Sequence, residues 1–123
     1  MIPTIQRLVP MAFVADVQRS IDFYAHLGFT IHNTHADEIS GELVWAWLTT
    51  GSAHLMIAKA SEQVVPDQQA VLFYLYTESV EPVRNALLEA GLDPGPISMP
   101  FYAPKGEFRL TDPDGYVLMI SHV

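Results

Sequence analysis

Three landmarks occur twice in the 123-residue sequence, and each second copy follows the first by 63 residues. They are a residue suited to a helix N-cap, a helix-ending glycine and the tripeptide Leu-Met-Ile, found at Asp16 and Ser79, at Gly28 and Gly91, and from Leu55 and Leu118. Because three landmarks share one spacing, an internal duplication explains them better than chance does. The chain is therefore predicted to contain two copies of a strand–helix–strand–strand–strand unit.

One amphipathic helix is predicted in each copy, over 17–27 and 80–90. Apolar side chains recur there at helical spacing, at Val17, Ile21 and Tyr24 and at Val80, Val83 and Leu87. Pro82 falls in the first turn of the second helix, where a missing N–H is tolerated. The two glycines end the helices.

The other segments favour strands and turns. Strands are expected over 8–14, 29–33, 43–49, 54–58, 71–76, 97–102, 107–111 and 116–122. A helix covers only one face of its own sheet, so one copy cannot close a core alone. Pairing two copies gives a curved mixed sheet around a groove, which is a natural place for a ligand.

The predicted fold class is α+β, with two βαβββ modules that form one domain over 1–123. Module 1 covers about 5–58, a polar linker covers 59–69, and module 2 covers about 70–123.

Composition narrows the function classes. The absence of cysteine excludes disulfides, thiol catalysis and metal sites built on cysteine. A net charge of −8 repels nucleic acid and attracts a cationic small molecule, although it also serves solubility alone. No apolar run reaches the roughly 18–20 residues of a membrane span, and the first residues do not resemble a signal peptide. We therefore expect a cytoplasmic protein without membrane contact.

Side chains alternate across a strand, so those facing the groove follow from their parity. We expect ligand contacts from Phe13, Trp45, Trp47, Met56, Tyr74, Tyr76 and Met119, with polar groups from His54, Tyr102, Glu107 and Arg109. The aromatic side chains suit stacking on a flat or cationic ligand; a packed core or a dimer interface is the alternative interpretation. Glu107 and Arg109 either contact the ligand or pair with each other.

Two further segments bear on the groove. The proline-rich loop 93–105, which carries Met99, Phe101 and Tyr102, is expected to form either a rim or a plain connection. His32 and His35 are expected in or beside a loop over 32–42, which leaves His54 as the histidine that enters the groove. No nucleophile elbow, phosphate loop or dinucleotide fingerprint is present, so no catalytic residue is assigned.

Two stretches resemble the vicinal oxygen chelate superfamily, which holds glyoxalase I, extradiol dioxygenases, fosfomycin-resistance enzymes and bleomycin-resistance binding proteins. They are LVPMAFVADVQRSIDFYAHLGF (8–29), similar to its first strand and helix, and GEFRLTDPDGYVLMI (106–120), similar to its closing hairpin. The resemblance covers essentially the whole chain and implies the two-module fold. It also implies a homodimer, because many relatives complete their grooves with a second subunit. It does not select a reaction.

The resemblance further implies where a metal would be held. Metal enzymes of the superfamily place His, Gln or Glu at four symmetric groove positions, which are here Val9, Met56, Leu72 and Met119. Valine and leucine have no donor atom, and a thioether suits copper(I) rather than harder divalent ions. We therefore expect no metal and no cofactor.

The leading hypothesis is a metal-independent small-molecule binding protein. It would resemble the bleomycin-resistance type and sequester a cationic aromatic antibiotic, giving antibiotic resistance. One alternative is a glyoxalase- or dioxygenase-like metal-dependent lyase or oxidoreductase with displaced ligands such as His54 and Glu107. A second alternative is a structural dimer module without a ligand pocket.

Overall fold

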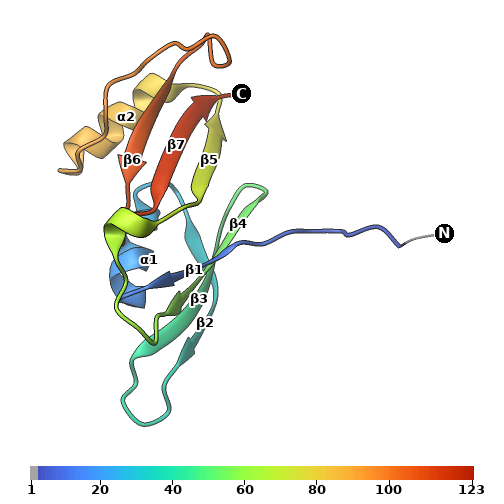
Figure 1. Cartoon of the computed structure of the whole chain (residues 1–123), viewed down its shortest axis with the longest axis vertical. Helices are drawn as coiled ribbons and strands as arrows, with labels where there is room; N and C mark the ends of the chain where they lie inside the picture. The colour runs from blue at the N-terminus through green and yellow to red at the C-terminus, as the bar shows by residue number, and fades with distance from the viewer. Residues whose placement is uncertain (1–2) are drawn as a thin grey trace. The chain divides into compact units, whose positions relative to one another are not determined.

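The computed structural model describes residues 3–123 and divides the chain into two compact units. Unit 1 is Met1–Gln63 and unit 2 is Val64–Val123, so the boundary falls within the polar segment 59–69. Each unit has a helix and a sheet of its own (Figure 1). The helices within residues 3–123 are too short or too polar to cross a membrane.

Unit 1 is a four-stranded mixed sheet with one helix. Its elements are β1 (Met11–Val14), α1 (Val17–Ala25), β2 (Thr30–Ala36), β3 (Leu43–Thr50) and β4 (Ala53–Lys59). The strand order is β1-β4-β3-β2, with β1 parallel to β4 and the other neighbours antiparallel. Asp16 caps α1 as predicted, because its Oδ1 accepts a 3.0 Å hydrogen bond from the backbone N–H of Arg19.

Unit 2 repeats this plan with one strand fewer. Its elements are a single 3-10 turn η1 (Pro66–Gln68), β5 (Leu72–Thr77), α2 (Val80–Glu89), β6 (Glu107–Thr111) and β7 (Val117–His122). The strand order is β5-β7-β6, with β5 parallel to β7 and β6 antiparallel to it. Ser79 is the N-cap residue of α2 as predicted, but its side chain makes no capping hydrogen bond.

The strand register confirms the internal repeat. Met11 lies opposite Met56 in unit 1, and Tyr74 lies opposite Met119 in unit 2, which is a shift of 63 residues for both partners. The pairing of β6 with β7 repeats that of β3 with β4 at a shift of 62 residues for β6. The protein therefore has the predicted α+β fold with two modules.

Each sheet buries the face that its helix covers. In unit 1 the buried side chains come from alternate positions of β3 and β4 and from α1, namely Ala46, Leu48, Leu55, Ile57, Val17, Ile21 and Tyr24. In unit 2 they come from β6, β7 and α2, namely Phe108, Leu110, Leu118, Ile120, Val80 and Leu87. This alternation leaves the opposite face of each sheet for the side chains predicted to bind a ligand.

A tight turn joins β6 to β7. The Oδ1 atom of Asp112 accepts 2.9 Å hydrogen bonds from the backbone N–H groups of Asp114 and Tyr116. Gly115 has a φ of +88°, and a Cβ atom there would lie 2.5 Å from both the Cα and the carbonyl oxygen of Pro66. The turn therefore packs against η1 so closely that its last position requires glycine.

The predicted strand over 97–102 is wrong. Only Ser98 pairs there, in an isolated antiparallel bridge with Glu107. Prolines at positions 94, 96, 100 and 104 remove backbone N–H donors, so the segment cannot form a continuous ladder.

The predictions for the first two strands of unit 1 also need correction. The first strand begins at Met11 rather than at residue 8, because Pro10 has no N–H group to donate to a ladder. His32 and His35 lie within β2, not in a loop. This edge strand carries mostly polar side chains and has two register irregularities, which hide its alternation in the sequence.

Candidate functional site

The open face of unit 1 is the sheet face that α1 does not cover. It carries side chains from β1, β3 and β4, namely Met11, Phe13, Trp45, Trp47, His54 and Met56. Register places Trp47 beside Met56, and Met56 beside Met11, in one row across the strands. The Phe13 side chain is 52% exposed, so this face presents aromatic and thioether groups to solvent.

A hydrogen bond orients the largest side chain of this face. The Nε1–H group of Trp47 donates to Nδ1 of His54 over 3.1 Å, and the two ring centroids are 5.8 Å apart. His32 of β2 contacts the same indole edge-on, with ring centroids 5.3 Å apart. Because Nδ1 of His54 accepts this bond, the neutral imidazole carries its proton on Nε2.

The open face of unit 2 is the sheet face that α2 does not cover. It carries Leu72, Tyr74, Tyr76, Glu107, Arg109 and Met119. The Tyr74 and Tyr76 rings are stacked with centroids 6.1 Å apart, and Tyr76 is 64% exposed. The two phenol rings form a flat aromatic surface on β5, at the edge of the sheet.

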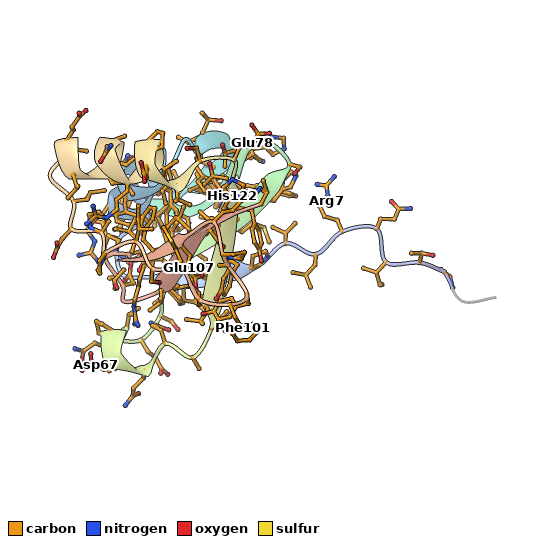
Figure 2. The ribbon with its side chains drawn as sticks, turned by 90° about the horizontal axis from the view of Figure 1, so that it is seen from above. Arg7, Asp67, Glu78, Phe101, Glu107 and His122 are labelled. Atoms are coloured by element: carbon orange, nitrogen blue, oxygen red, sulfur yellow. The ribbon has the colours of Figure 1, made fainter. Side chains whose placement is uncertain are left out.

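A buried carboxylate lies on the same face. Glu107, which Figure 2 labels, begins β6. It is only 2% exposed. A hydrogen bond with the Glu107 side chain raises the pKa of Tyr102 to about 12, and a weaker interaction with Tyr74 acts in the same direction. The three side chains therefore form one polar cluster, and the phenol of Tyr102 stays protonated at neutral pH.

The loop that carries Tyr102 runs along the outer edge of β6. Gly95 donates a 2.8 Å backbone hydrogen bond to Arg109, and Ser98 exchanges two 2.9 Å backbone hydrogen bonds with Glu107. Phe101, which Figure 2 labels, follows Ser98 in this loop. Its side chain is 94% exposed. The loop is thus anchored at its start and presents aromatic side chains beyond that anchor.

The predicted site residues fall into two groups, one in each unit. Unit 1 brings together Phe13, Trp45, Trp47, His54 and Met56, and unit 2 brings together Tyr74, Tyr76, Tyr102, Glu107, Arg109 and Met119. That they contact a ligand stays a prediction. Glu107 and Arg109 form no ion pair with each other in the described chain. Sequence reasoning missed the contact of His32 with Trp47, because the polar side chains of β2 resemble those of a loop.

The four positions that correspond to the metal ligands of superfamily enzymes carry valine, leucine and two methionines. Leu72 lies on β5, Met56 on β4 and Met119 on β7, while Val9 precedes β1. Within residues 3–123, His, Asp and Glu side chains do not gather in any group of three or more that could hold a metal ion. The side chains at these four positions therefore do not fit hard divalent ions, which prefer nitrogen and oxygen ligands.

Solved structures of low sequence identity share the fold. A bleomycin resistance determinant encoded on the transposon Tn5 is 17% identical, covering 96% of this chain and 98% of that chain at a TM-score of 0.76. A bleomycin-binding protein from the bleomycin producer Streptomyces verticillus, solved with copper(II)-bleomycin, is 18% identical, covering 99% of both chains at 0.74. A glyoxalase-related enzyme from Clostridium phytofermentans is 15% identical, covering 98% of this chain and 96% of that one at 0.79.

The sequence itself matches a family model. The model describes the Glyoxalase/Bleomycin resistance protein/Dioxygenase superfamily and matches residues 4–120. Comparison with curated protein sequences gave no match. The match spans both units and agrees with the duplicated fold, so the chain belongs to the glyoxalase/bleomycin resistance protein/dioxygenase superfamily.

Proposed function

We propose that this protein is a metal-independent small-molecule binding protein whose ligand is a cationic aromatic antibiotic of the bleomycin type. The observation that carries the proposal is the aromatic character of the two open faces. Phe13, Tyr74 and Tyr76 are all exposed, although phenylalanine is among the side chains most often buried.

Exposed aromatic surfaces support binding on physical grounds. A contiguous apolar surface that stays in contact with water costs free energy, and such surfaces commonly mark sites of recognition. The indole of Trp47 is held by His54, and the Tyr74 and Tyr76 rings are stacked on each other. Rings held in place in this way lose little freedom when a flat ligand stacks on them.

The charge of the chain supports a cationic ligand. The net charge of −8 raises the local concentration of cations around the molecule. The face of a phenol or indole ring also attracts a cation through its quadrupole. Both effects favour a ligand that is aromatic and positively charged.

The comparisons support binding more than metal-dependent chemistry. Bleomycin-binding proteins and a glyoxalase-related enzyme share the fold at similar scores, so the fold does not choose between these functions. The donor set supports binding, since Val9 and Leu72 offer no ligand atom at the positions where enzymes of the superfamily hold a metal. We further propose that the protein works in the cytoplasm as a homodimer, with a solution mass of twice 13.7 kDa.

The test is a fluorescence titration with metal-free bleomycin. Trp45 and Trp47 are the two tryptophans of the chain, and both belong to the open face of unit 1. We expect a saturable change in their emission at micromolar bleomycin. Absence of a saturable change contradicts the antibiotic proposal. A stoichiometric nickel, zinc, iron or manganese ion in protein purified without chelator contradicts metal independence.

A further inference from the structure

One carboxylate oxygen of unit 2 is buried without a partner. The Oε2 atom of Glu107 has no hydrogen-bond partner among residues 3–123, and the whole side chain is 2% exposed. Buried polar atoms in folded proteins are nearly always hydrogen-bonded, because water can no longer satisfy them. An unsatisfied carboxylate oxygen therefore calls for an explanation.

The neighbouring cation does not supply one. Arg109 lies two residues along β6 on the same face, but it is exposed and forms no ion pair with Glu107 in the described chain. Ser121 lies opposite Glu107 on β7. On the other side, Ser98 pairs with Glu107 through the backbone alone. The strands on either side of Glu107 thus leave Oε2 without a hydrogen-bond donor.

Phenol rings stand on the same face as this oxygen. Tyr102 interacts with the Glu107 side chain and with Tyr74, and Tyr74 stacks on Tyr76. In the strand register Tyr76 lies opposite Ser121, which lies opposite Glu107, so β5, β7 and β6 place them in one row. One anionic acceptor and three aromatic rings are the groups that recognise an organic cation.

We propose that unit 2 holds a subsite for an organic cation that carries at least one N–H group, with Oε2 of Glu107 as its hydrogen-bond acceptor. The cation donates to Oε2, and the rings of Tyr74, Tyr76 and Tyr102 stand beside its charge. This inference rests on the proposed function and deepens it, because it names the chemical class of the cationic group.

The subsite distinguishes between kinds of cation. A protonated amine, a guanidinium or an amidinium satisfies Oε2, whereas a quaternary ammonium carries charge without an N–H donor. A quaternary ligand that reaches this position would leave a buried carboxylate oxygen without a hydrogen bond, which weakens binding. The aromatic rings alone do not make this distinction, since they attract either kind of cation.

Tyr102 covers the carboxylate and is a positioning residue. Its own side chain is 60% exposed, and the backbone around it is held by local hydrogen bonds from Ala103 to Pro100 and from Gly106 to Ala103. Rotation of this side chain gives a ligand access to Oε2 without breaking the β6–β7 ladder.

The test compares two aromatic monocations, benzamidine with N–H donors and benzyltrimethylammonium without them, by calorimetric titration of the full chain. We expect benzamidine to bind at least about tenfold more tightly, the size of one hydrogen bond to a charged group. This comparison needs only the wild-type protein. Equal affinity for the two probes, or no binding of either, overturns the proposal.

Three variants locate the effect. Glu107→Gln is expected to lower benzamidine affinity at least about tenfold and to abolish the preference between the probes. Glu89→Gln makes the same change in net charge at an exposed position of α2 and should match the wild type. Tyr102→Phe removes the hydroxyl but keeps Oε2, so the preference for benzamidine should persist. A folded Glu107→Gln protein with unchanged benzamidine affinity contradicts the proposal.

A parallel titration with bleomycin separates this inference from the proposed function. If bleomycin does not bind while benzamidine binds with the expected preference, the cation subsite stands and the antibiotic proposal fails. If bleomycin binds and the wild-type protein does not prefer benzamidine, the proposed function stands and the subsite is wrong.

Discussion

The indole N–H of Trp47 donates a 3.1 Å hydrogen bond to Nδ1 of His54, and this bond joins neighbouring strands on the open face of unit 1. It fixes the orientation of a half-buried ring and the tautomer of the imidazole together. An aromatic surface whose largest ring is already oriented is better prepared to stack on a ligand than a free one.

Replacing His54 with alanine should therefore loosen Trp47. The variant loses the acceptor of the indole N–H, and we expect a loss of about 1 kcal/mol in the free energy of unfolding. Near-ultraviolet circular dichroism should show a weaker tryptophan signal. His26→Ala is the control, because His26 is exposed at the end of α1, on the other side of the sheet, and should leave both quantities nearly unchanged. The same spectrum in both variants would show that the bond does not orient the indole.

The high pKa of Tyr102 gives a measurable pH dependence. The hydrogen bond with Glu107 raises this pKa from 10.0 to about 12, so the contribution to stability is complete below pH 10 and is lost as the pH rises towards 12. Absorbance titration of the wild-type and Tyr102→Phe proteins at alkaline pH measures this pKa. The difference between the two curves is the ionisation of the Tyr102 phenol.

Glu107→Gln should move that difference titration towards lower pH. The variant removes the negative charge that disfavours tyrosinate. A Tyr102 midpoint that stays at the same pH in this variant contradicts the assigned cause.

Gly115 should be less tolerant of substitution than other glycines of unit 2. Gly115→Ala combines a φ of +88° with a Cβ atom 2.5 Å from the backbone of Pro66. Gly91→Ala has a φ of +84° and open space around its Cβ, so it should cost only the backbone strain of about 1–2 kcal/mol.

We expect the Gly115 variant to cost about 1–3 kcal/mol more, because the clash adds to the strain. Urea unfolding of both variants measures the difference. Equal midpoints would contradict the close packing of the β6–β7 turn on η1.

The two helix caps should differ although they occupy equivalent positions. Asp16 accepts a hydrogen bond from the backbone N–H of Arg19, so Asp16→Ala should lower stability by about 1 kcal/mol. The Ser79 side chain caps nothing, so Ser79→Ala should cost less than about 0.5 kcal/mol. Thermal unfolding compares them, and a larger effect at Ser79 would reverse the assignment.

These cases show what the sequence predicts well. The 63-residue spacing, the two N-cap positions and the alternation along β3 and β4 are local patterns, and the structure reproduces them. Alternation correctly separated Trp45 and Trp47 from the buried Ala46 and Leu48, because successive side chains of a strand must point to opposite faces.

What the sequence did not predict depends on irregular backbone. The proline-rich segment around Ser98 pairs with β6 at isolated points instead of forming a strand. The same loop brings Tyr102 to Glu107, a contact that follows from its conformation and from no periodicity. His32 reaches Trp47 from an edge strand whose polar side chains resemble those of a loop.

The most direct test of the proposed function is calorimetric titration of metal-free bleomycin into the protein in the presence of a chelator. We predict saturable binding at micromolar or lower concentration, weakened at least about tenfold by Trp47→Ala and unchanged by His26→Ala at the exposed end of α1. No binding, or binding that appears only when a divalent metal ion is restored to the protein, would contradict metal-independent recognition of the antibiotic.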